Sequence, residues 1–120
     1  MKGIKIGNKI SKYPIIQGGM GVGVSLHKLA GNVSKEGGIG IISTADIGYQ
    51  EPDFSENPQK ANLRAIGKEI KKARQIAGED KILGVNIMVA MKNYAEIAKE
   101  CVEQKIDLII SGAGIPKELP

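Results

Sequence analysis

The chain alternates short, continuously apolar runs with longer stretches in which apolar residues recur at helical spacing. The apolar runs lie at 14–17, 39–43, 81–90 and 106–110, and their wealth of Ile, Val and Leu is typical of strands buried on both faces. Because helical stretches separate these strands, we expect an α/β fold with a parallel sheet, in which ligands bind outside the carboxyl ends of the strands.

Three helices are predicted between the strands. The first should begin with Ser25 as its N-cap and end at Gly37. The second should run from Asn57 and Pro58, as N-cap and first helical residue, to Gly78, and the third should begin in a capping box at Asn93 and Glu96. The residues expected on the buried sides are Leu26, Leu29, Ala30 and Val33, then Leu63, Ile66, Ile70, Ala73 and Ala77, then Ile97, Ala98, Cys101 and Val102.

The first twelve residues alternate apolar and polar positions around Gly7 and Asn8, a turn pair typical of a β-hairpin. Ile4, Ile6 and Ile10 are expected on one face of that hairpin.

Glycine is concentrated where the first and last strands end. The stretch "YPIIQGGMGVGVS" places four glycines at 18–23, and "SGAG" follows the last strand. Neither the dinucleotide fingerprint nor the Walker A pattern fits, since Val24 or Leu26 stands where each requires another residue. A tight turn needs one or two glycines, so we favour loops that let a flat or anionic ligand approach main-chain N–H groups.

Few other residues carry candidate chemistry. Asn86 lies inside an apolar strand and is either a core amide bonded to a loop or a group directed at a ligand. Met20 is either filler or a cover for a planar ring. His27 is interpreted as a helix-end residue, Cys101 as a core residue, and Asp107, at the start of a strand, as structural. No metal-binding motif is present.

Composition narrows the classes of protein. The net charge of +4 is small, and no nucleic-acid motif accompanies it. One cysteine fits a reducing compartment, and no apolar stretch is long enough for a membrane span or forms a signal peptide. The sequence predicts a soluble cytoplasmic protein that acts on a small-molecule substrate, without nucleic-acid or membrane partners.

Four motifs in order, "YPIIQGGMGVGVS", "LAGNVSKEGGIGIIS", "GVNIMVA" and "SGAGIP", resemble the N-terminal part of the nitronate monooxygenase (2-nitropropane dioxygenase) family. Enoyl-acyl-carrier-protein reductase II belongs to the same superfamily. The resemblance implies an FMN-binding TIM (β/α)₈ barrel and cofactor contacts from the three strand-end segments. The implied contact residues are Gln17, Gly18, Gly19, Met20, Asn86, Ser111, Gly112 and Ala113.

A complete barrel needs about 250 residues. We therefore interpret residues 1–120 as a single partial domain, the hairpin plus four strands and three helices of the N-terminal half. The family's catalytic base, the histidine of a "GGH" motif, is expected beyond residue 120. Self-association, or pairing with the missing half of the barrel, is expected.

Three hypotheses about the function remain open. The first is nitronate oxidation with dioxygen, which "STADIGYQEPDFSEN" and "GVGVS" favour. The second is FMN- and NAD(P)H-dependent enoyl reduction, and the third is flavin binding without catalysis. A small flavodoxin-like domain is disfavoured because it would bring a fifth strand and a final helix.

Overall fold

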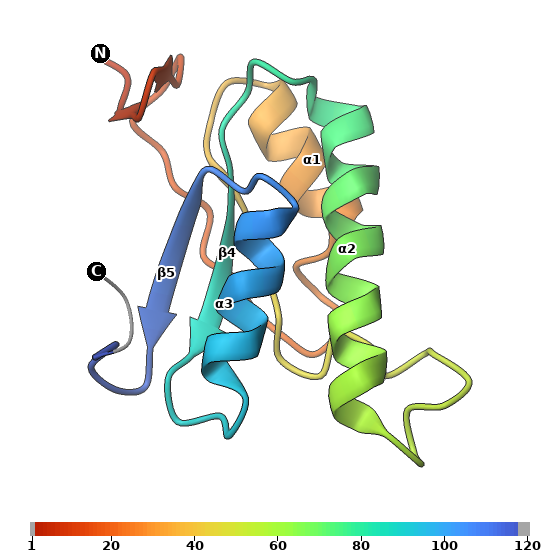
Figure 1. The fold of residues 1–120 in the computed structure, drawn as a ribbon. Coiled ribbons are helices and arrows are strands. Elements are labelled where there is room, and N and C mark those ends of the chain that lie inside the picture. The colour runs from red at the N-terminus through yellow and green to blue at the C-terminus, as the bar shows by residue number, and fades with distance from the viewer. Residues whose placement is uncertain (1, 118–120) are drawn as a thin grey trace.

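The computed structural model describes residues 2–117 and shows two layers, a parallel sheet with three helices on one face (Figure 1). The sheet contains β3 (Gly40–Ser43), β4 (Leu83–Met88) and β5 (Leu108–Gly112), in the order β3-β4-β5. The register pairs Ser43 with Asn86 and Asn86 with Ile110, so these residues share one row across the sheet. The predicted parallel α/β arrangement is confirmed.

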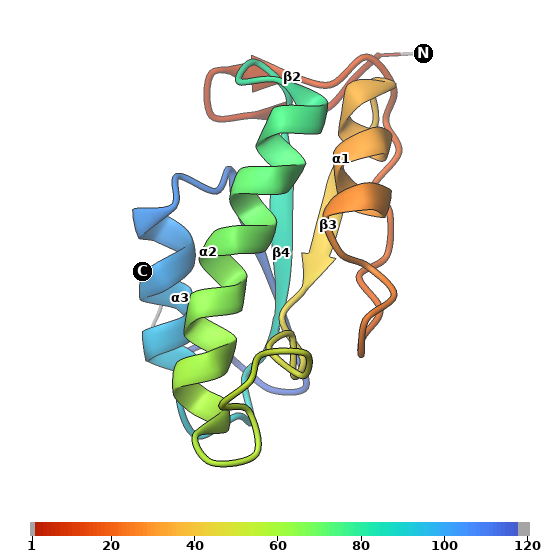
Figure 2. The same ribbon diagram turned by 90° about the vertical axis from the view of Figure 1, so that its right-hand side faces the viewer.

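The helices are α1 (His27–Lys35), α2 (Pro58–Ala77) and α3 (Tyr94–Glu103), and Figure 2 shows them side by side over the strands. The main core lies between the two layers. It combines buried residues of the three helices with alternate residues of β3 and β4, namely Ala30, Ile66, Ile70, Ala73, Ile97, Cys101, Ile42, Leu83, Val85 and Ile87. Cys101 is fully buried, as predicted, and burial raises the pKa of its thiol to about 12.

Helix α2 has the limits that the sequence predicts. The Asn57 side chain accepts a hydrogen bond from the main-chain N–H of Lys60 at 3.2 Å, and Pro58 is the first helical residue. Gly78 ends the helix with φ of 102°, a conformation in which a side chain would be strained.

Two details of α1 differ from the prediction. Ser25 is not the N-cap, because its hydroxyl is bound within the preceding loop and Leu26 occupies the cap position without a side-chain bond. The first turn of α1 is instead contacted by Glu69 of α2. The Glu69 carboxylate lies 2.8 Å from Nδ1 of His27 and 3.4 Å from the main-chain N of His27. Leu29, expected in the core, is exposed because the outer face of α1 has no covering element among the described residues.

Helix α3 begins as expected after Asn93, but no capping bond forms there, so the predicted capping box is wrong. Ile97, Ala98 and Cys101 are buried, whereas Val102 is 62% exposed. The side chain of Val102 lies outside the arc of the helix that contacts the sheet and α2.

The N-terminal hairpin consists of β1 (Lys5–Ile6) and β2 (Lys9–Ile10), at the amino-terminal end of the strands (Figure 1). Ile4 and Ile6 pack on a second buried cluster formed by Ile39, Ile41 and Ile82. Ile10 does not share their face and is 68% exposed. The short turn pairs Ile10 with Lys5, so the side chain of Ile10 projects on the opposite side.

The predicted first strand, 14–17, is reduced to a single parallel bridge between Ile16 and Ile39. It is also not buried, because Ile15 is 56% and Ile16 is 48% exposed. This segment forms one edge of the sheet, and β5 forms the other edge among the described residues. Because adjacent side chains point to opposite faces, both faces of this segment are left partly open among the described residues, and Ile15 lies in a groove beside Leu29 and Val33 of α1.

Candidate functional site

The face of the sheet that carries no helices holds the candidate site. Side chains alternate between the two faces along a strand. Val85 and Ile87 enter the core under the helices, so Asn86 and Met88 project from the other side, which we call the open face. Met88 is exposed there and Asn86 is half-buried.

The glycine loop, residues 18–24, crosses the carboxyl ends of β3 and β4 in close contact. A Cβ on Gly19 would lie 2.9 Å from the Asn86 Cβ and 2.9 Å from a methyl carbon of Ile41. A Cβ on Gly21 would lie 2.8 Å from the Ser43 hydroxyl oxygen. These two glycines are therefore required for the loop to pack against the strands, and this packing places the loop next to Asn86.

Two other glycines are not explained by packing. A Cβ on Gly18 or on Gly112 would meet no atom within 4 Å among the described residues. Neither residue has the positive φ that favours glycine. Both stand at the carboxyl end of a strand segment, Gly18 just after the bridge at Ile16 and Gly112 at the end of β5. Bare backbone at such places leaves room for a ligand to approach the main chain.

The side-chain amide of Asn86 has no hydrogen-bond partner within residues 2–117. The main chain of Asn86 is paired within the sheet, and its oxygen accepts from the N–H of Thr44 at 3.1 Å and from the Thr44 hydroxyl at 2.8 Å. The alternative of a core amide bonded to a loop therefore finds no support in the geometry. One donor pair and one acceptor are available on the open face, a set that matches the polar edge of a heterocycle.

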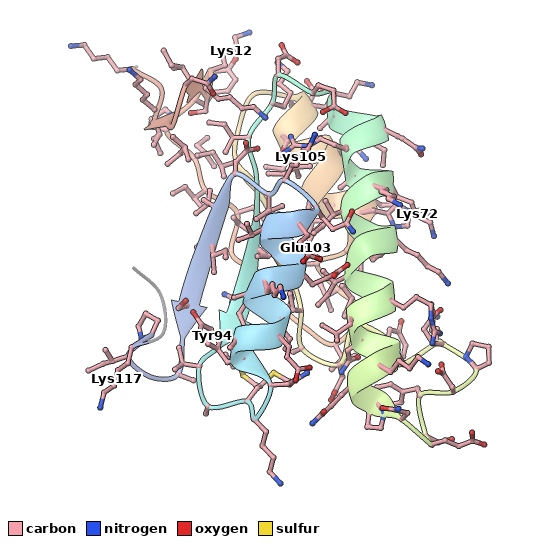
Figure 3. All side chains as sticks on the ribbon, in the orientation of Figure 1. Lys12, Lys72, Tyr94, Glu103, Lys105 and Lys117 are labelled. Carbon is pink, nitrogen blue, oxygen red and sulfur yellow. The ribbon has the colours of Figure 1, made fainter. Side chains whose placement is uncertain are left out.

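Ser111 does not present its side chain to the open face. Its hydroxyl lies 2.7 Å from the Tyr94 hydroxyl, which points from the start of α3 toward the end of β5 (Figure 3). The Gly112 oxygen accepts from the Val89 N–H at 2.8 Å, and Ala113 turns the chain with φ of 56°. Residues 111–113 can therefore reach a ligand on the open face through their backbone.

Gln17 and Met20 are placed differently. The Gln17 amide is used within the protein, on the main chain of Ile41 and on Ser25. The Met20 side chain is 64% exposed and so is free to cover a ligand. The role of Ser25, whose hydroxyl binds the loop, is missed by sequence reasoning because the residue also fits an N-cap.

Other residues with potential chemistry lie elsewhere. His27 pairs with Glu69 between α1 and α2, on the helical side of the sheet. Among residues 2–117, no three His, Cys, Asp or Glu side chains gather as a metal site. In the same part of the chain, no helix has the length and apolar character to cross a membrane.

These features define an α/β protein with a parallel sheet and a ligand-accessible face at the carboxyl ends of its strands. A family model described as nitronate monooxygenase matches residues 4–115, and the chain belongs to that family. No curated protein matches the chain.

Solved structures similar to the chain include FabK from Thermotoga maritima, at 30% identity with a TM-score of 0.67. A methionine-to-alanine mutant of the same FabK has 30% identity and a TM-score of 0.65. Each comparison covers 90% of this chain, but only 29% and 31% of the respective FabK chain. The chain thus spans less than a third of these structures.

Proposed function

We propose that residues 1–120 form the N-terminal part, a single partial domain, of an FMN-binding (β/α)₈ barrel with oxidoreductase activity. The observation that carries the proposal is the Asn86 amide, which has no partner within residues 2–117 and lies beside the glycine loop at the carboxyl ends of the strands, where parallel α/β proteins bind ligands. Membership of the nitronate monooxygenase family and the similarity to FabK support it. We call the full assembly of this chain with the remaining strands and helices the complete barrel.

The residues of the open face fit an isoalloxazine ring. Asn86 would hydrogen-bond its polar edge, and Gly18 and Gly112 would allow main-chain atoms to approach its plane. Gly19 and residues 111–113 would border it through the backbone, and Met20 would cover it and exclude water. FMN itself supplies the electron-transfer chemistry.

Nitronate oxidation with dioxygen is the reaction we propose, because the family model that covers most of the chain carries that description. Enoyl reduction with NAD(P)H is the second candidate, favoured by the similarity to FabK. Oxygen uptake with an alkyl nitronate, set against NAD(P)H oxidation with an enoyl thioester, separates the two in the complete barrel. A complete barrel that binds FMN and is inactive in both assays would leave flavin binding alone.

The first prediction uses the two glycines with open space. Gly18→Ala and Gly112→Ala should each raise the dissociation constant of FMN by about tenfold or more, because one methyl group would lie where a ring approaches the backbone. The melting temperature should change little, since no neighbouring atom of residues 2–117 lies within 4 Å of either added carbon. Flavin fluorescence titration and thermal unfolding of the apoprotein measure the two quantities.

Gly19→Ala is the matched control for this pair. Its methyl group would collide with Asn86 and Ile41, so the melting temperature should fall whether or not FMN binds. FMN affinity unchanged in both Gly18→Ala and Gly112→Ala would contradict a flavin at this face.

The second prediction concerns Asn86. Asn86→Ala should weaken FMN binding or shift its reduction potential and visible spectrum, while leaving the melting temperature of the apoprotein nearly unchanged. The reason is that the side-chain amide, unlike the main-chain oxygen bound by Thr44, has no protein partner to lose within residues 2–117. A drop in melting temperature with unaltered flavin properties would show instead that Asn86 is structural.

A further inference from the structure

The glycine loop is closed on itself by Ser25, which is 1% exposed. The Ser25 hydroxyl oxygen accepts hydrogen bonds from the Met20 N–H at 2.9 Å and from Gln17 Nε2 at 3.1 Å. The Ser25 main-chain N–H donates to the Met20 oxygen at 2.8 Å, and its oxygen accepts from the Ser43 N–H at 2.9 Å. One small residue therefore ties both ends of the loop together and fastens them to the end of β3.

Gln17 fixes the other end of the loop. Its Oε1 accepts from the Ile41 N–H at 2.9 Å, and its Nε2 donates to the Ile41 oxygen at 3.1 Å and to the Gly18 oxygen at 2.8 Å. The side-chain amide thus behaves as an extra peptide group, continuing the pairing with β3 after the main-chain bond from Gln17 N–H to Ile39. The Gly18 oxygen is thereby bound to the Gln17 side chain, whereas the main-chain N–H groups of Gly18 and Gly19 have no hydrogen-bond acceptor within residues 2–117.

We propose that Ser25 and Gln17 are positioning residues that hold the glycine loop in its ligand-binding shape before any ligand arrives. Glycine-rich backbone is costly to order, and a ligand that must order it binds more weakly. The partly buried hydrogen bonds made by Ser25 and Gln17 offset that cost during folding. The proposal rests on the proposed function only in taking FMN as the ligand. It assigns Gln17 an effect on FMN binding through the shape of the loop, instead of a contact between its side chain and FMN.

Ser25→Ala tests this, with Ser34→Ala as a matched control. Ser34 is also fully buried, and its hydroxyl donates to the Ile82 oxygen at 2.6 Å and accepts from the Gly40 N–H at 2.9 Å, away from the loop. Each variant loses a buried serine hydroxyl that makes at least two hydrogen bonds, so both should lower the melting temperature. Only Ser25→Ala should change the loop.

The decisive readout is amide hydrogen exchange by mass spectrometry, which is also informative if the 120-residue chain associates. Ser25→Ala should speed exchange of the Met20 amide, followed in a peptide spanning 18–24, by about tenfold, because the Met20 N–H loses its acceptor. Ser34→Ala should leave that peptide unchanged. In the complete barrel, Ser25→Ala should raise the dissociation constant of FMN by about tenfold, and Ser25→Thr, which keeps the hydroxyl, should restore most of the affinity.

The outcomes separate this proposal from the proposed function. Unchanged exchange at 18–24 in Ser25→Ala, or equal loss of FMN affinity in Ser25→Ala and Ser34→Ala, overturns the positioning role. Faster exchange in a complete barrel that never binds FMN keeps the positioning role and overturns the flavin assignment. If Ser25→Ala does not fold, Ser25→Cys replaces the hydroxyl with a somewhat larger thiol, which is a weaker acceptor, and is judged by the same comparison.

Discussion

The 120-residue chain, produced alone, is expected to associate at micromolar concentration through the edge formed by residues 14–17 and the groove beside it. The groove has a volume of about 660 Å³, and Tyr13, Ile15, Leu29 and Val33 are its apolar lining. The segment is bridged to β3 on one side only, and Ile15 and Ile16 project apolar side chains into solvent. Unpaired edges and exposed apolar patches of this kind promote association.

In the complete barrel we propose that this edge and groove are covered by the remaining strands and helices. Binding of the remaining half of the barrel should therefore compete with self-association, and co-production of that half should suppress self-association. Light scattering and sedimentation measure the association, and amide exchange on the same sample reports folding. A protected, cooperatively unfolding monomer would refute the partial-barrel interpretation and favour a complete small α/β domain.

A variant with a charge on this edge tests whether the chain associates through residues 14–17. Ile15→Glu should shift the chain toward monomer by at least about tenfold in dissociation constant, because a carboxylate would have to be buried in the contact. Val102→Glu is the matched control, since Val102 is a similarly exposed aliphatic residue on α3, away from the edge. Equal effects of the two charges would show that the association is general aggregation.

The elements governed by local signals are the ones that the sequence predicts. Helix α2 begins at an Asn-Pro pair and ends at a glycine, and both signals act through the backbone within one turn. The parallel order of β3, β4 and β5 follows from alternating strands and helices. Asp107, expected to be structural, binds the Leu83 N–H at 2.9 Å and joins two ion pairs.

The details that fail depend on contacts distant in sequence. Ser25 looks like an N-cap in the sequence, but its hydroxyl is bound by Met20 and Gln17, and the helix end is met by Glu69, 42 residues beyond His27. The segment at 14–17 has a buried composition, yet Ile15 and Ile16, on opposite faces, are both exposed because no described element covers them. Composition reports what a segment is suited for, whereas exposure depends on which neighbours are present.

In the candidate site, too, local features are predicted by the sequence, whereas contacts between distant residues are not. The sequence identifies the loop and Asn86, because glycine clusters and a polar residue in an apolar strand are local anomalies. It does not separate the glycines that pack, Gly19 and Gly21, from Gly18 and Gly112, which have open space. That distinction needs the positions of Ile41, Ser43 and Asn86 in three dimensions.

Asp107→Asn is expected to lower the free energy of unfolding by about 2–3 kcal/mol at neutral pH, because its carboxylate receives three charged or main-chain donors at a partly buried position. Besides the Leu83 N–H, these donors are Arg74 at 2.8 Å and Lys9 at 3.0 Å. The carboxylate thereby joins β4, α2 and the hairpin at the amino-terminal end of the sheet. Denaturant unfolding at pH 7 measures the loss.

The pH dependence of the free energy of unfolding shows whether the charge of Asp107 accounts for the stability lost in Asp107→Asn. Burial alone raises the pKa of Asp107, but the hydrogen bonds from Leu83, Arg74 and Lys9 outweigh it and hold the pKa below its usual range. A carboxyl group with a depressed pKa in the folded state contributes stability above its unfolded pKa of about 3.9, and that contribution is lost as the pH falls through the folded value. The stability gap between the native chain and Asp107→Asn should therefore be constant from pH 7 to about pH 5 and shrink below about pH 4.

Asp53→Asn is the control for a carboxylate that pairs with an arginine in solvent. Asp53 lies 2.7 Å from Arg64, and that contact, with Arg64 as the main cause, also lowers its pKa. Its removal should have little effect on stability at any pH, because water and salt screen an exposed pair. A gap for Asp107→Asn that stays the same at pH 3 and pH 7 would show that packing, and not the charge of Asp107, accounts for the loss, since protonation would then leave the contribution of this side chain unchanged.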